Sequence, residues 1–178
     1  SKDVLVFEEK DDTFSCFIYK TKSEKFLLIG SNQTLSTEYR FLDADNPSGE
    51  WKTIQERQRD HEYSVEHYGD DFYIISNNKA KNFRLMKTSI EATSIENWKE
   101  VIPNRNDVLL EGIDIFKNHL VVSERVNGLS SIRVIKWSDW SEHYIEFNDP
   151  AYNAYTFANP EFDTDVLRFG YTSLTTPN

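Results

Sequence analysis

The stretch "ENWKEVIP", residues 96–103, places a tryptophan among charged and polar residues and closes with a proline. A similar stretch occurs twice more, as "WKTIQER" from Trp51 and "WSEHYIE" from Trp140. Successive tryptophans, with Trp98 in the middle, are therefore 47 and 42 residues apart. A spacing that stays nearly constant indicates a repeated structural unit. A period of about 40–50 residues is typical of repeat folds such as β-propellers.

Two further rows of sequence repeat in step with the tryptophans. One row has an arginine followed by alternating apolar residues, as "YRFL" at 39–42, "FRLM" at 83–86 and "IRVI" at 132–135. The other row is a strand-like run that begins at 24 ("EKFLLI"), 70 ("DDFYII") and 117 ("KNHLVV"). Short runs rich in Val, Ile, Tyr and Phe, separated by Gly, Asn and Asp, indicate β-strands. Three rows with one period therefore predict propeller blades of four strands each.

The predicted fold is all-β, a partial β-propeller with about three complete four-stranded blades and part of a fourth. We expect the chain, 1–178, to be a single segment of a propeller domain. The blades are predicted at about 13–57, 61–102 and 108–147, with an incomplete blade at 152–178. The strands expected in the complete blades are 13–20, 25–30, 37–42, 51–57, 61–68, 71–77, 82–90, 97–102, 108–116, 119–126, 129–137 and 142–147.

Neither end of the chain is predicted to form a complete blade. Residues 3–9, "DVLVFEE", have the composition of a strand with no blade before it. The runs "AYTFANP" at 154–160 and "VLRFGYTSL" at 166–174 are expected to supply two strands of the fourth repeat. Helical periodicity is weak throughout, and its one candidate, 89–98, is short. Because propellers usually have about 4–8 blades, we expect the chain to be part of a larger protein.

The three repeated tryptophans are predicted to be structural. Trp51, Trp98 and Trp140 each begin the fourth, outermost strand of a blade. There an indole can cover the apolar face between neighbouring blades while its N–H finds a polar partner. We favour this role over the stacking of a ligand on the ring.

Charge and cysteine content limit the classes of partner. The formal net charge of −10 is spread along the chain, which argues against nucleic acid and anionic membranes, since both require a basic surface. The single cysteine, Cys16, excludes an internal disulfide and fits a reducing compartment. No apolar run reaches transmembrane length. We expect a cytoplasmic location, with the periplasm as the alternative, since a targeting signal before Ser1 would lie outside this sequence.

The sequence contains no recognisable catalytic motif. The nearest approach to the G-x-S-x-G element of serine hydrolases is "GLSSI" from Gly128, which lacks the second glycine. The four histidines are scattered, and "HEYSV" has Val65 where a zincin motif has its second histidine. We therefore predict no catalytic residue, no metal site and no cofactor in this chain.

Three runs resemble a known family. They are "HEYSVEHYGDDFYIISN" at 61–77, "NDVLLEGIDIFKNHLVVSERVNGLSSIRVI" at 106–135 and "NPEFDTDVLRFGYTSLTTP" at 159–177. All three are similar to the oligopeptidase B (protease II) group of the prolyl oligopeptidase family. The resemblance implies a seven-bladed propeller that caps an α/β-hydrolase domain. It also implies that the parent protein is a serine peptidase that cleaves short peptides after Lys or Arg, with a propeller that restricts substrate size and encloses the active site.

The same resemblance places the catalytic machinery outside this chain. In this family the nucleophilic Ser, the Asp and the His lie beyond the propeller, which here means after Asn178. The segment alone is therefore expected to be inactive, and its implied partners are an oligopeptide substrate and the α/β-hydrolase domain. Four charged residues in the matching runs are candidates for contacts with that domain, namely Glu124, Arg125, Asp163 and Arg168. Ion pairs within a blade, or solvated strand ends, are the alternative for each.

Two other classes of function stay open at this point. One is a stand-alone propeller that binds proteins or ligands, which a stop codon directly after Asn178 would support. The other is a carbohydrate-active propeller, which needs two carboxyl groups about 5–10 Å apart in a pocket. The isolated segment is expected to self-associate, because a partial ring leaves the blade faces near 3–20 and 151–173 uncovered.

Overall fold

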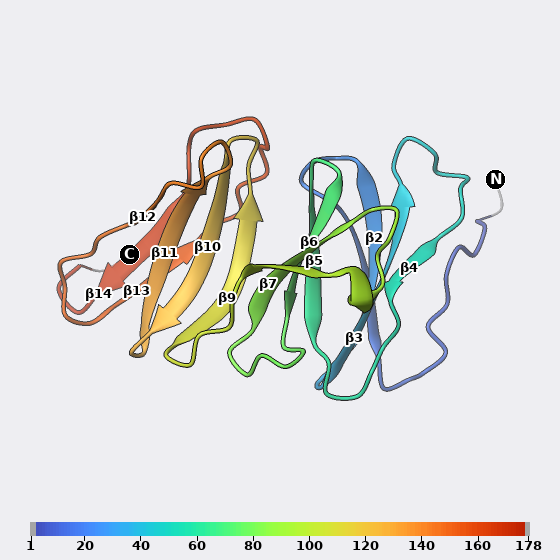
Figure 1. The fold of residues 1–178 in the computed structure, drawn as a ribbon, viewed down its shortest axis with the longest axis horizontal. Coiled ribbons are helices and arrows are strands. Elements are labelled where there is room, and N and C mark those ends of the chain that lie inside the picture. Colours follow the sequence, from blue (N-terminus) through green and yellow to red (C-terminus); the bar gives the residue numbers. More distant parts are fainter. Residues whose placement is uncertain (1–2, 177–178) are drawn as a thin grey trace.

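The computed structural model describes residues 3–176 and shows an all-β fold. These residues form three four-stranded antiparallel sheets and one two-stranded sheet, which follow one another side by side from the N-terminal to the C-terminal end (Figure 1). The predicted fold class is therefore confirmed. The last two residues of the predicted fourth blade, 177–178, lie outside the described part of the chain.

The strands lie close to their predicted positions. The first sheet contains β1 (Ser15–Lys20), β2 (Phe26–Gln33), β3 (Ser36–Asp43) and β4 (Lys52–Gln55). The second contains β5 (Tyr63–Tyr68), β6 (Asp71–Ser76), β7 (Arg84–Ser89) and β8 (Lys99–Ile102), with a 3-10 turn at Ile95–Asn97. The third contains β9 (Val108–Ile115), β10 (His119–Val126), β11 (Leu129–Lys136) and β12 (Glu142–Tyr144), and the fourth contains β13 (Tyr152–Thr156) and β14 (Phe169–Ser173).

Each sheet is a meander in which every strand pairs with its neighbour in the chain. The turn between the first and second strands therefore lies at one end of the sheet, together with the loop between the third and fourth strands. We call this the hairpin end. The turn between the second and third strands and the linker to the next sheet lie at the opposite end, which we call the linker end.

Alternating residues of one strand face two neighbouring sheets. On β6, Phe72 and Ile74 pack in a core shared with the first sheet, whereas Tyr73 and Ile75 pack in a core shared with the third sheet. This follows from the two-residue period of a strand, in which successive side chains point to opposite faces. A third core joins the third and fourth sheets. Each complete sheet that lies between two others is thus apolar on both faces, as a stack of blades requires.

The repeated arginines lie on equivalent strands. Arg40, Arg84 and Arg133 lie on the third strand of the first, second and third sheets. Each forms an ion pair within its own sheet, Arg84 with Glu100 and Arg133 with Glu142, both at 3.3 Å, and Arg40 with Glu38. The glutamate partner lies on the fourth strand for Arg84 and Arg133 and on the same strand for Arg40, so each arginine of this row is paired within its sheet but not through one repeated geometry.

The prediction of a strand at 3–9 is wrong. The segment is irregular and runs beside the first sheet (Figure 1). Its side chains hold it there: the Glu9 carboxylate lies 2.7 Å from Arg57 and the Phe7 ring lies 4.6 Å from the Arg40 guanidinium. A strand needs a neighbouring edge for its backbone hydrogen bonds, and this segment contacts the sheet through side chains instead.

Candidate interaction site

Trp98 fills the junction between the first and second sheets. Its side chain is buried directly before β8, and its ring centroid lies 5.7 Å from that of Tyr63 and 5.8 Å from that of His61. The indole N–H donates a hydrogen bond of 2.7 Å to the carbonyl oxygen of Thr93. The ring is thus enclosed by protein and is not free to stack on a ligand. Trp51, before β4, is half-buried.

Trp140 departs from the expected role. Its side chain is 47% exposed and does not cover an apolar face between sheets. The backbone at Trp140 has a φ of 57°, and its N–H donates to the carbonyl oxygen of Lys136 at 3.0 Å. This tight left-handed turn directs the indole edge-on against Trp137, with ring centroids 5.7 Å apart, rather than into a junction. The turn that precedes the short β12 explains the difference from Trp98.

The four candidate contact residues lie at two opposite ends of the molecule. Glu124 and Arg125 are near the linker end of β10. Asp163 and Arg168 belong to the connection between β13 and β14, at the hairpin end, where Asp163 pairs with Lys117 at 2.7 Å. The eight residues of β10 span roughly 25 Å. A domain that packs on one end can therefore contact only one of the two pairs.

Glu124 takes part in a buried charge cluster. Its side chain is fully buried, pairs with Arg105 and lies 3.3 Å from Arg133, and it accepts a 3.2 Å hydrogen bond from the Tyr144 hydroxyl. The contact between Glu124 and Arg133 is the ion pair within a blade that the sequence analysis kept as the alternative. Arg105 belongs to the linker before β9, so this cluster fastens the linker to the third sheet.

The remaining candidates are more exposed. Arg125 donates to Glu111 at 2.7 Å on the surface of the third sheet. The backbone of Arg168 is held by Asn159, whose side chain accepts from the Arg168 N–H at 2.8 Å and donates to its carbonyl oxygen at 3.1 Å. The connection 157–168 crosses the hairpin end of the third sheet, where Lys117 N donates to the carbonyl oxygen of Phe162 at 2.9 Å. Arg125, Asp163 and Arg168 thus lie at the surface, and the charges of Arg125 and Asp163 are paired within the chain.

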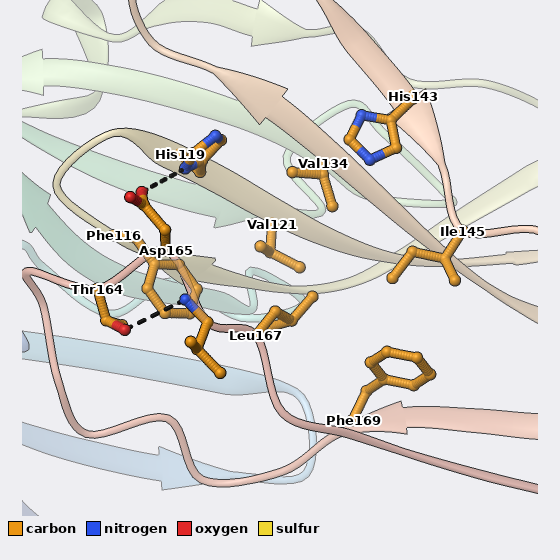
Figure 2. Close-up of a pocket in the computed structure, with 11 residues that line it drawn as sticks. Phe116, His119, Val121, Val134, His143, Ile145, Thr164, Asp165, Leu167 and Phe169 are labelled. Atoms are coloured by element: carbon orange, nitrogen blue, oxygen red, sulfur yellow. Dashed lines mark hydrogen bonds and ion pairs between the residues drawn. The ribbon is translucent and has the colours of Figure 1, made fainter.

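A pocket of about 270 Å³ lies between the third sheet and the segment that leads into β14 (Figure 2). Its floor is apolar, and its rim holds His119, His143 and Asp165. His119 Nδ1 lies 4.0 Å from Asp165 Oδ1. The lining contains one carboxylate, so this pocket lacks the pair that glycosidic chemistry requires. A mostly apolar lining with a few polar groups is the general character of a ligand pocket.

Two buried histidines each contact a serine. His61 Nε2 lies 2.9 Å from Ser76 Oγ, and His67 Nδ1 lies 2.8 Å from Ser23 Oγ. Both imidazoles are almost fully enclosed, and burial lowers the pKa of His61 and of His67. Ser76 is fully buried, so a substrate does not reach it. Among residues 3–176 there is also no group of three or more side chains placed to hold a metal ion.

No helix of the described residues is long and apolar enough to cross a membrane.

The whole chain matches a known family. Residues 1–178 match the profile of the N-terminal β-propeller domain of prolyl oligopeptidase. Dipeptidyl aminopeptidase BI from Pseudoxanthomonas mexicana is 41% identical over 178 residues, which is 99% of this chain and 24% of the relative. Protease 2 from Moraxella lacunata is 33% identical over 175 residues, 98% of this chain and 25% of the relative. The chain thus spans about a quarter of the length of these curated relatives.

Solved structures show the same arrangement of sheets. Oligopeptidase B from Leishmania major superposes with a TM-score of 0.89 at 25% identity, covering 99% of this chain and 26% of that one. Oligopeptidase B from Trypanosoma brucei gives the same TM-score at 24% identity, covering 98% of this chain and 26% of that one, and supports the fold.

Proposed function

Because the chain belongs to the prolyl oligopeptidase family, as part of its N-terminal β-propeller domain, we propose that it forms part of the wall that restricts substrate size in a serine peptidase acting on short peptides. The observation that carries this proposal is the match of all 178 residues to that domain. The parent's activity rests on the relatives, since the chain corresponds to about a quarter of their length.

The packing between sheets supports a wall. Neighbouring sheets share continuous apolar cores, so a polypeptide has no ready path between them. The first strands of the first two sheets are also joined, because the Tyr19 hydroxyl donates a 2.6 Å hydrogen bond to the carbonyl oxygen of Val65. In a propeller these first strands surround the central channel. A route to an enclosed active site would then admit a short peptide more easily than a folded protein.

The finer proposal is cleavage after Lys or Arg, as implied by the resemblance to oligopeptidase B, whose Leishmania major structure is 25% identical. A second candidate is the removal of dipeptides from a free N-terminus. It is favoured by the 41% identical relative, which is named a dipeptidyl aminopeptidase. The resemblance to oligopeptidase B implies that the acidic residues that select a basic side chain lie outside this chain, after Asn178.

Three substrates separate these candidates when they are assayed with the full-length parent protein. The first is an N-terminally blocked short peptide with Arg at the cleaved position, the second is the same peptide with Ala there, and the third is an unblocked dipeptidyl amide. Preference for the first supports cleavage after basic residues, and preference for the third supports dipeptide removal. The 178-residue chain alone is expected to hydrolyse none of them.

The size restriction needs a separate comparison. One cleavable sequence is offered to the parent protein both as a free short peptide and as a loop of a stably folded domain. We expect hydrolysis of the free peptide only. Equal rates for the two forms would contradict the proposed role of the propeller.

A further inference from the structure

One ion pair connects two sheets that are not adjacent in the chain. Lys22 lies in the turn between β1 and β2, and its Nζ is 2.7 Å from Oδ1 of Asp114 on β9. The pair joins the first sheet to the third, past the hairpin end of the second. Both side chains are mostly buried, with 11% and 21% of their surface exposed. The Lys22 ammonium also lies 3.3 Å from the centre of the Phe116 ring, a cation–π contact that strengthens the link.

A third ionisable side chain, Glu66, lies at this crossing. It belongs to β5, the first strand of the second sheet. Its Oε2 is buried and finds no hydrogen-bond partner among the described residues. Burial raises the pKa of Glu66 to about 7. The Asp114 charge acts in the same direction, whereas the backbone N–H groups of His67 and Lys22 and the Lys22 ammonium oppose it.

The other titratable groups near Glu66 are tyrosines. Tyr19 and Tyr39 belong to the first sheet, and burial together with the Glu66 charge raises the pKa of both phenols. Tyr73 is its cross-strand partner on β6. These phenols stay neutral through the range in which Glu66 titrates, so the charge of the crossing is set by Lys22, Asp114 and Glu66.

We propose that Lys22, Glu66 and Asp114 form a proton-controlled tie that holds the first three sheets together at their hairpin end. With Glu66 protonated, one ammonium faces one carboxylate and the crossing is neutral. When Glu66 releases its proton to solvent, a second carboxylate is left in a poorly hydrated place beside Asp114. Separation of the strands, which admits water, then costs less free energy. The tie rests on the proposed function, because its loss would let neighbouring sheets of the substrate-restricting wall separate.

The direction of the pH effect follows from the two states of Glu66. In the closed arrangement its pKa is about 7, whereas its ordinary value is 4.5. The closed state therefore holds the proton more tightly than an opened state in which Glu66 meets water. Stabilisation of the closed state is complete below the ordinary value and is lost as the pH rises through about 7.

Two measurements on the 178-residue chain test the tie. A carboxyl ¹³C NMR titration is expected to show Glu66 titrating near neutral pH. Hydrogen exchange of the β5 and β9 amides, divided by the intrinsic rate, is expected to increase by up to about tenfold between about pH 6 and about pH 8, because the opening equilibrium changes tenfold per pH unit only until the pH reaches the closed-state pKa of about 7. Glu66→Gln keeps the site neutral and should abolish this increase. Glu56→Gln, at an exposed position, is the matched control and should keep it.

Either of two results would overturn the proposal. Titration of Glu66 in the ordinary glutamate range, or an unchanged exchange increase in Glu66→Gln, would exclude the tie. Asp114→Asn gives a second check if Glu66→Gln folds poorly: it should lower the midpoint of Glu66 and leave β5 and β9 in fast exchange at both pH values. None of these readouts involves the catalytic domain, so a failed peptidase assay would not affect them.

Discussion

Trp98 contacts both sheets at its junction, and its indole N–H is satisfied by a backbone carbonyl. Trp140 occupies the same place in the sequence repeat but is half exposed, because its left-handed turn carries the ring to the hairpin end. The position in the sequence repeat therefore determined where each tryptophan lies relative to the fourth strand. The backbone conformation of the preceding turn determined the direction of its side chain.

This difference predicts unequal effects of two matched substitutions. Trp98→Ala removes an enclosed ring and should lower the free energy of unfolding by about 3–5 kcal/mol, the usual cost for a large core side chain. Trp140→Ala removes a half-exposed ring and should cost much less. Urea denaturation followed by circular dichroism measures both. Similar losses for the two variants would contradict the assigned roles.

The buried histidines predict a loss of stability in acid. Burial lowers the pKa of His67 below its ordinary value of 6.5, so the unfolded chain binds a proton more readily than the folded one. The stabilisation is complete above 6.5 and falls as the pH decreases from there towards the folded-state pKa.

The urea midpoint of unfolding, measured as a function of pH in the Glu66→Gln protein, tests this effect. The Glu66→Gln background is needed because Glu66 makes the stability change with pH in the opposite direction over the same pH range. We expect His67→Gln to flatten the decline in this background, whereas His143→Gln, at an exposed position, should not. His61 is buried as well and should keep part of the decline in His67→Gln. A decline of the same size in both variants would argue against the role of His67.

At the scale of the elements, two glycines allow an aromatic ring to lie across a strand pair. Gly30 on β2 is the cross-strand partner of Phe17 on β1, and Gly170 on β14 is the partner of Tyr155 on β13. A Cβ on Gly30 would overlap the Phe17 ring, and one on Gly170 would lie 2.6 Å from Cζ of Tyr155. The ring covers the bare backbone of the glycine, a known way to stabilise glycine in a sheet.

We therefore predict that Gly30→Ala destabilises the chain by about 1–3 kcal/mol, the usual cost of overpacking. Gly112→Ala is the control, since Gly112 on β9 has open space around its Cα and an ordinary φ. Thermal unfolding should show a clear loss for the first variant and little change for the second. A Gly30→Ala protein that melts like the parent would show that the Phe17 ring moves aside freely.

At the scale of the whole molecule, the two ends of the row of sheets remain open. Strand β14 pairs on one side with β13 and has no strand on its other side among the described residues. Val4, Val6 and Phe157 are exposed by 82%, 67% and 53%. Free strand edges and exposed apolar side chains both favour association with another chain.

We propose that the isolated chain self-associates through these ends. Size-exclusion chromatography with light scattering should show a dimer or a larger species that grows with concentration. Val166→Lys, at an exposed position before β14, should shift the equilibrium towards the monomer. A 20.9 kDa species that persists at high concentration would refute this expectation.

The sequence by itself determined the strands, their grouping into sheets and the family. Alternation with a period of two, turn residues and the repeat of about 45 residues are local signals, and strands pair here with their neighbours in the chain. β10, for example, was expected at 119–126 and lies at His119–Val126.

Only the tertiary structure decided which distant side chains meet. Lys22 and Asp114 are 92 residues apart, and no repeat or motif marks them as partners, because their contact depends on how three sheets stack. The burial of Glu124 and the irregular course of 3–9 have the same origin. Each depends on surfaces contributed by other elements, and local sequence carries no record of those surfaces.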